Sequence, residues 1–264
     1  MPELPEVETA RRRAENALAG KRIQRAAAAA DGLIFDRAPP SEVEHALTGR
    51  TVVGSGRKGK YFWLLLDQPP HPVFHFGMSG RLHLYRNGTP PPKYWKLEIE
   101  ASDGTIVVFT DMRRLGRIRL AADPENEPPV SLLGFDPLIS LPSAAEIQRL
   151  LAVRRGPIKA VLLDQSFSAG VGNWVADEVL YQAGLSPLRP ANQLSRPEVR
   201  RLRTALKNIA EQSVALDADA TRFPIHWLFN YRWDRRIGRG PRGEPLVRQR
   251  IGGRTTAWAP SRQK

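Results

Sequence analysis

The hydrophobic positions of the chain follow two different periods, and the change of period divides it into two halves. From Leu4 to about Leu18, apolar residues recur at helical spacing, and Gly20 is a stop signal. Short aromatic and β-branched runs then alternate with turn formers such as Asn87-Gly88 and Asp103-Gly104. Strands are predicted at residues 61–66, 73–76, 81–85, 95–100 and 105–110. Residues 1–121 are therefore expected to form a β-sandwich domain with a helix at its start.

The second half has a helical period. A proline-rich segment, 122–142, predicts a linker, and residues 143–234 predict a helical domain. Helices are expected at 144–152, 158–163, 173–183 and from 196 to about 216, and strands at 245–251 and 255–259. The two strands flank Gly252-Gly253, so residues 235–264 are expected to form an ordered hairpin instead of a disordered basic tail. The expected fold class is α+β.

The composition of the chain limits the kinds of partner and chemistry that it can have. The chain has 264 residues, enough for two domains, and its 40 Lys and Arg against 27 Asp and Glu give a formal net charge of +13. Such a charge favours a polyanionic partner, most often nucleic acid, although a merely soluble basic protein is an alternative. There is no cysteine, which excludes disulfides, thiolate catalysis and thiolate zinc sites. No apolar run is long enough to span a membrane and no signal peptide is evident, so a soluble protein working inside a cell is expected.

The N-terminus is the first candidate for chemistry. Removal of Met1, usual before a small residue, leaves Pro2 with a free secondary amine. An α-amino group titrates near pH ~8 and a lysine near ~10.4, so far more of the amine is an unprotonated nucleophile at neutral pH. Attack on an aldehydic sugar carbon gives an iminium that acidifies the neighbouring C–H, and Glu3 beside it could act as an acid–base group. Alternatively, Pro2 and Glu3 are ordinary residues of a helix start.

Other segments are suited to binding a phosphate backbone. The glycine turn before Asn173 joins two predicted helices, an arrangement that binds anions and DNA but also occurs in plain helix hairpins. Lys60 follows a basic run and is either a phosphate contact or an exposed turn lysine. Arg254 lies at the hairpin tip, where a guanidinium can bind phosphate. Met78 and Leu115 lie in glycine-bounded turns; they could wedge between base pairs, or simply belong to the core.

Several motifs occur in an order that resembles a known family. They are PELPEVETARR, RKGKYFWLLL, HFGMSG, TDMRRLGRIRL, DQSFSAGVGNWVADEVLYQAGLSP and GGRTTAW. Over nearly its whole length the chain resembles the bifunctional formamidopyrimidine-DNA glycosylases, the family that includes endonuclease VIII. The resemblance implies an N-terminal β-sandwich, a helix–two-turns–helix domain and a hairpin finger. It also implies a base-excision-repair enzyme that flips an oxidised base out of duplex DNA and cleaves the strand by β- and δ-elimination.

The resemblance also implies roles for individual residues. Pro2 matches the nucleophile that forms a Schiff base at C1′, Glu3 the acid, Lys60 the lysine of the elimination step, and Arg254 the finger arginine of δ-elimination. Asn173 and Arg114 match phosphate-binding positions, while Met78 and Arg113 match residues that fill the gap left by the flipped base. The complete set of implied DNA contacts is Lys60, His75, Met78, Tyr94, Arg113, Arg114, Leu115, Asn173 and Arg254.

The chain departs from the family pattern in three places. The finger lacks the four cysteines of zinc-binding members, so it resembles the zincless finger of plant and fungal relatives, with Trp258 and Val247 as packing candidates and no metal or cofactor expected. Leu115 replaces an aromatic wedge, which predicts weaker stacking on the partner base. Tyr94 stands where relatives have a DNA-contacting histidine.

Substrate and setting follow from the same resemblance. Residues 216–224 resemble the short form of the loop that covers the flipped base, which implies a preference for formamidopyrimidines and hydantoins and poor removal of 8-oxoguanine. The expected partner is double-stranded DNA with oxidised bases or abasic sites, bound by a monomer. Zincless relatives favour a nuclear location, with the bacterial cytoplasm as the alternative. A non-catalytic helix–two-turns–helix nucleic-acid-binding protein is the competing hypothesis, but it leaves Pro2, Glu3, Lys60 and Arg254 together unexplained.

Overall fold

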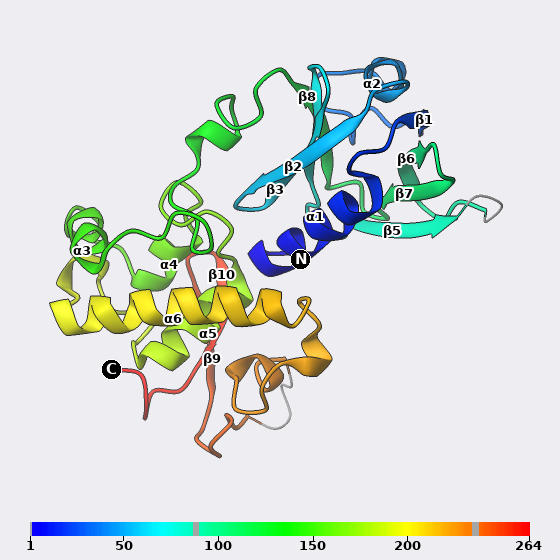
Figure 1. The fold of residues 1–264 in the computed structure, drawn as a ribbon. Helices are drawn as coiled ribbons and strands as arrows, with labels where there is room; N and C mark the ends of the chain where they lie inside the picture. Colours follow the sequence, from blue (N-terminus) through cyan, green and yellow to red (C-terminus); the bar gives the residue numbers. More distant parts are fainter. Residues whose placement is uncertain (1, 87–89, 234–237) are drawn as a thin grey trace. The chain divides into compact units, whose positions relative to one another are not determined.

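The computed structural model describes residues 2–86, 90–233 and 238–264 (Figure 1). The described chain folds as two compact units. The first comprises Pro2 and residues 6–132, and the second comprises residues 3–5 and 133–264. Met1, the predicted turn at Asn87-Gly88 and the first residues of the predicted finger segment lie outside the described residues.

The first unit is a β-sandwich, as predicted. In its described part, one antiparallel sheet has the order β1-β6-β7-β5 and the other the order β2-β3-β4-β8. The strands are β1 (Ile23–Ala28), β2 (Val52–Lys58), β3 (Tyr61–Leu66), β4 (His71–His75), β5 (Arg81–Arg86), β6 (Trp95–Ala101), β7 (Thr105–Thr110) and β8 (Arg117–Ala121). Helix α1 (Leu4–Leu18) runs into this unit, and helix α2 (Pro40–Leu47) packs on it.

Aromatic rings fill the core of the sandwich. Phe62 stacks on Phe74 with ring centroids 4.8 Å apart, and Phe76 stacks on Phe109 at 5.7 Å. The buried face of α1 belongs to the same core cluster through residues such as Val7. Burial of these large side chains supplies the main driving force for this unit.

The second unit is mainly helical. It contains α3 (Ala144–Ala152), α4 (Ile158–Leu163), α5 (Asn173–Ala183), α6 (Arg196–Ala215) and the short 3₁₀ turns η2 (Ala191–Gln193), η3 (Ala220–Arg222) and η4 (Leu228–Asn230). A further turn, η1 (Val130–Leu132), closes the first unit. Helix α6 starts with a capping box between Ser195 and Glu198, in which each side chain binds the other residue's backbone N–H. The helices lie where the apolar period predicted them, and the α+β fold class is confirmed.

The C-terminal hairpin is ordered in its described part. Strands β9 (Val247–Ile251) and β10 (Arg254–Trp258) pair antiparallel around Gly252-Gly253, whose φ angles of 58° and 75° fit a two-residue type I′ turn. Trp258 is buried, as expected, but the Val247 side chain is 38% exposed. The prediction that Val247 holds the hairpin is therefore wrong, and Ile251, Thr256 and Ala257 are buried together with Trp258.

Among the described residues, no helix combines the length and apolar character that crossing a bilayer requires. In the same ranges, His, Asp and Glu side chains form no group of three or more suited to holding a metal ion.

Candidate functional site

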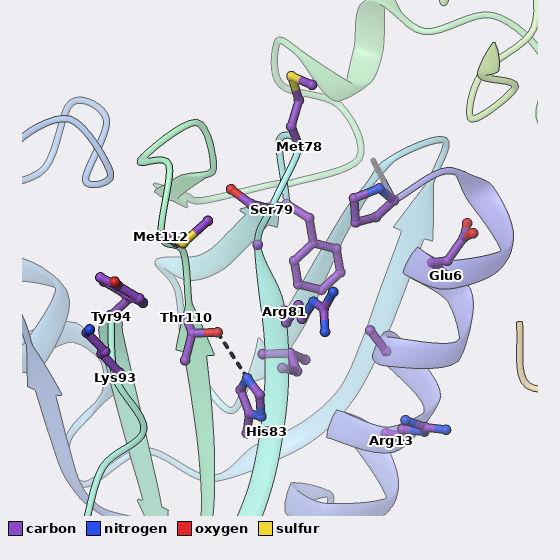
Figure 2. Close-up of a pocket in the computed structure, with 15 residues that line it drawn as sticks. Glu6, Arg13, Met78, Ser79, Arg81, His83, Lys93, Tyr94, Thr110 and Met112 are labelled. Atoms are coloured by element: carbon purple, nitrogen blue, oxygen red, sulfur yellow. Dashed lines mark hydrogen bonds between the residues drawn. The ribbon is translucent and has the colours of Figure 1, made fainter. Parts of the chain in front are cut away.

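Pro2 lines an open cavity in the first unit (Figure 2). The cavity has a volume of about 720 Å³, within the range of small-molecule sites. Helix α1 contributes Glu6 and Arg13 to one side, and the opposite side carries His83, whose Nε2 lies 3.0 Å from the Thr110 hydroxyl. The predicted amine nucleophile thus lies beside a space large enough for a nucleobase and lined by both cationic and polar groups.

The carboxylate of Glu3 is built into the start of α5 in the second unit. Glu3 is 2% exposed, and its two oxygens accept hydrogen bonds from the backbone N–H groups of Trp174 (3.0 Å) and Val175 (3.1 Å). These are orphan donors at the positive end of the helix dipole, so they stabilise a negative charge. The glycine turn before Asn173 was predicted to approach a phosphate; the anion that the structure places there is the carboxylate of Glu3.

Lys60 and His75 come together at one end of the second sheet in the first unit. Lys60 follows Gly59, whose φ of 61° forms the two-residue turn between β2 and β3. Burial, together with the nearby Lys60 charge, lowers the pKa of His75 to about 4, so the imidazole is neutral at pH 7. Its Nδ1 accepts from the Gly77 N–H at 3.2 Å, which leaves the ring proton on Nε2 as a donor.

The predicted gap-filling residues lie on two interlocked loops, 77–80 and 111–116. Met78 and Leu115 are each 40% exposed, so the alternative that they belong to the core is wrong. A Cβ on Gly77 would lie 2.3 Å from the Leu115 carbonyl oxygen, so only glycine allows the two loops to pack this closely. Arg113 is exposed on the second loop.

The buried carboxylate of Asp111 organises both loops, and the sequence reasoning did not identify it. Its oxygens accept from the Ser79 hydroxyl at 2.5 Å and from the backbone N–H groups of Arg113, Leu115 and Gly116 at 3.1, 2.8 and 2.6 Å. The sequence signal for this role is weak: in the TDMRR segment, a short acidic side chain follows a strand, and such a side chain can accept hydrogen bonds from the backbone N–H groups of the residues after it. Asp111 therefore holds the exposed side chains in place.

Arg114 and Tyr94 occupy unusual backbone conformations, with φ angles of 56° and 64°. The Arg114 guanidinium binds the buried Asp31 carboxylate through Nε and Nη2, and Lys96 binds the same carboxylate at 2.8 Å. Burial raises the pKa of Asp31, but these hydrogen bonds outweigh it and hold that pKa at about 2. The Lys93 ammonium lies 5.0 Å from the centroid of the Tyr94 ring, and both residues line the Pro2 cavity.

Asn173 and the hairpin tip are brought together in the second unit. The Asn173 side-chain amide donates to the Thr255 carbonyl at 2.9 Å, next to the exposed Arg254. The hydrogen bond to β10 thus fixes the position of Asn173 relative to Arg254, and both residues are predicted to contact phosphate.

A buried ionic cluster fastens the hairpin to the helices, and sequence reasoning missed it as well. Lys159 is completely buried and donates to the Asp177 carboxylate, which also binds Arg232 at 2.5 Å and the Ala257 N–H at 3.2 Å. Lys159 also donates to the Asn173 carbonyl at 2.9 Å. The cluster therefore connects α4, α5 and β10. Its contacting pairs are up to 80 positions apart in the chain, so no local pattern could reveal it.

Comparisons with known proteins agree with this geometry. The formamidopyrimidine-DNA glycosylase N-terminal domain matches residues 1–118, and the H2TH domain of the same glycosylase matches residues 133–224. A formamidopyrimidine-DNA glycosylase of Arabidopsis thaliana is 40% identical over 278 residues, covering 100% of this chain and 71% of the relative. One of Geobacter metallireducens is 39% identical over 216 residues, covering 81% of this chain and 79% of the relative.

Solved structures give the same result. A crystal structure of wild-type Lactococcus lactis Fpg with a DNA containing an oxidised pyrimidine is similar with a TM-score of 0.88 at 25% identity, over 100% of both chains. A MutM complex with DNA containing carbocyclic 8-oxoguanine is similar with a TM-score of 0.87, also at 25% identity and 100% coverage. The protein is a DNA glycosylase of base excision repair. More particularly, the chain belongs to the formamidopyrimidine-DNA glycosylase family, and the non-catalytic alternative is set aside.

Proposed function

We propose that this glycosylase is bifunctional: it removes oxidised purines through a Schiff base at Pro2 and then cleaves the strand as an AP lyase. The observation that carries the proposal is the position of Pro2 on a cavity large enough for a nucleobase, with Pro2 directly followed in the chain by Glu3, whose carboxylate is held by two backbone N–H groups. A terminal secondary amine at that place is a nucleophile that a purely structural helix start does not need.

In the proposed reaction, the Pro2 nitrogen lone pair attacks C1′ while the glycosidic C–N bond breaks and the base leaves with the bonding electrons. The Glu3 carboxylate accepts the proton that the Pro2 nitrogen loses and delivers it to the opening sugar-ring oxygen, while the departing base takes up a proton from solvent. The resulting iminium makes a C2′ proton acidic. Loss of that proton expels the 3′ phosphate, and a second elimination expels the 5′ phosphate. Lys60 serves the first elimination and Arg254 the second, each beside the phosphate that it binds.

The preferred substrates proposed are formamidopyrimidines and hydantoins, with 8-oxoguanine a poor one. The segment 216–224 supports this because it is short and internally held. Asp219 accepts from the Thr221 N–H at 3.0 Å, and Arg222 pairs with Asp217 at 3.0 Å. Phe223 anchors its end, 5.5 Å from the ring centroid of Trp174. A compact loop offers fewer contacts to a flipped base than a long one. The names of the relatives also refer to formamidopyrimidine.

Borohydride trapping tests the proposal. Protein whose terminal Pro2 has been verified by mass spectrometry is incubated with duplexes that contain one guanidinohydantoin, one 8-oxoguanine or no lesion. We expect a covalent band on the hydantoin duplex that maps to Pro2 and is lost in P2G. A band on both lesions keeps the amine mechanism and overturns the substrate preference. No band on any duplex, with the amine free, overturns the Schiff-base mechanism.

A further inference from the structure

Arg57, the penultimate residue of β2, is a buried cation outside the proposed catalytic set. Its side chain is 1% exposed. Its Nε donates to the Glu8 carboxylate on α1 at 2.9 Å, and its Nη1 donates to the Gly59 carbonyl at 3.0 Å. One guanidinium therefore bridges the helix to the turn that carries Lys60, and all of these residues belong to the first unit.

Glu8 is the fixed end of this bridge. The carboxylate is buried and also binds Arg11 at 2.9 Å and Arg12 at 2.7 Å, both from α1 itself. Burial raises the pKa of Glu8, but the surrounding arginines outweigh it and lower that pKa to about 2. The carboxylate is thus charged throughout the working pH range, and the bridge is a fork-shaped, charge-assisted contact.

The bridge sets the position of a short turn. Gly59 and Lys60 are the two turn residues between the paired Lys58 and Tyr61, so fixing the Gly59 carbonyl limits where Lys60 can lie. Helix α1, the other anchor, begins two residues after Pro2. A buried ion pair is weak evidence for stability, because desolvation offsets much of its attraction, whereas its directional hydrogen bonds do fix geometry.

We propose that Arg57 is a positioning residue. By bridging the Glu8 carboxylate and the Gly59 carbonyl, it fixes the position of Lys60 relative to α1, the helix that follows Pro2. The inference rests on the proposed role of Lys60 in elimination and phosphate binding. Lysine cannot replace Arg57 here, because its single ammonium lacks the planar fork that reaches two acceptors on different elements.

The test compares R57K with wild type, K60A and R12M, using a duplex with a single hydantoin. R12M is the matched control, because Arg12 binds the same carboxylate from α1 and its removal leaves the bridge to Gly59 in place. Base release and strand cleavage are measured separately, and DNA affinity is measured as a function of salt. For R57K we expect cleavage to fall about tenfold relative to base release and the salt slope to drop by about 0.9, the value of one phosphate contact. R12M should match wild type.

Each outcome decides a different point. If R57K keeps the wild-type cleavage-to-release ratio and salt slope while K60A changes both, the positioning role is wrong and the role of Lys60 stands. If K60A changes neither, the proposed role of Lys60 fails first. Should R57K melt below the assay temperature, E8D replaces it, because it retains the charge and withdraws the carboxylate by one methylene. E8D must then lower the same ratio, and an unchanged ratio overturns the proposal.

Discussion

The α-carbon of Gly172 faces the carboxyl group of Glu3 so closely that a Cβ there would lie 2.2 Å from Glu3 Cδ. The backbone of Gly172 has φ −122° and ψ −158°, which any residue adopts. Glycine is therefore required at this position because any side chain would clash with Glu3, and not because the backbone is strained.

We expect G172A to displace Glu3 from the Trp174 and Val175 N–H groups and to lower base release about 10²-fold, the cost of misplacing a reacting group by an ångström. DNA binding should change little. Single-turnover kinetics on a hydantoin duplex measure the effect. G156A is the control, because nothing lies within 4 Å of a Cβ at Gly156. Equal rates for G172A and wild type would refute the view that the close contact with Gly172 and the N–H groups of Trp174 and Val175 position Glu3.

Removal of the Asp111 carboxylate should loosen loops 77–80 and 111–116 together. D111A leaves three backbone N–H groups without their acceptor, which predicts a loss of about 3 kcal/mol or more in the free energy of unfolding. It should also weaken binding to lesion DNA, because Met78 and Leu115 lose their fixed positions. Urea unfolding and fluorescence anisotropy measure the two effects. D103A, which removes an exposed turn carboxylate, should change neither, and matching behaviour of the two variants would contradict the role of Asp111.

Glu178 predicts a pH dependence of stability. Burial raises its pKa from 4.5 to about 7, against the opposing hydrogen bonds from Gln182 and Phe229. The folded state therefore holds a proton that the unfolded state has already released, so this group's contribution to stability falls as pH rises from about 4.5 to about 7 and is constant above. The expected fall is about 3 kcal/mol.

E178Q should remove that fall, so wild type and E178Q should diverge across this window when urea unfolding is measured at several pH values. The difference between the two proteins is the quantity to follow, because neutral buried His75 acts in the opposite direction at overlapping pH. Glu8 contributes only at lower pH, since its pKa of about 2 makes its stabilisation disappear below about pH 4.5. A constant difference from pH 5 to 8 would rule out the raised pKa.

Chelators should leave activity unchanged. The chain has no cysteine, and the ionic cluster around Asp177 together with the Asn173–Thr255 contact ties the described hairpin to the helices. Strand cleavage is measured after prolonged dialysis against a strong chelator. A loss of cleavage that added zinc restores would show that a metal holds the finger after all.

The spacing of apolar residues was sufficient to predict α1, the helices α3 to α6 of the second unit and the C-terminal hairpin, because apolar spacing and glycine turns are local signals. Strands β1, β2 and β8 and helix α2 were not predicted. Strand β1 is rich in alanine, β2 in glycine and basic residues, and β8 alternates arginine with apolar residues, while α2 is only eight residues long. The motif-bearing residues Pro2 and Glu3 were also accessible from the sequence.

The residues that fix the site were not accessible in this way. Asp111, Arg57, Lys159 and Asp177 are buried charges, and a charged residue in a single sequence resembles a solvated surface residue until its partner is known. Lys159 meets Asp177 18 positions away, and Arg57 meets Glu8 49 positions away. Only tertiary structure joins such pairs, so the sequence could point to candidate reacting residues but not to the buried charges that hold the surrounding segments in place.

The ionic cluster that fastens the hairpin differs from a cysteine-bound metal in its sensitivity to oxidants. Thiolates are readily oxidised to sulfenic and higher acids, whereas carboxylates, guanidinium groups and backbone amides are not. A finger held by Asp177, Lys159 and Arg232 therefore survives conditions that would strip a cysteine-bound metal. Within the described ranges, the oxidation-sensitive thioethers belong to Met78 and Met112, both exposed on the Pro2 cavity. Conversion of Met78 to its sulfoxide would place a polar group at the predicted contact with the base stack, so we expect oxidation of that side chain to weaken lesion binding.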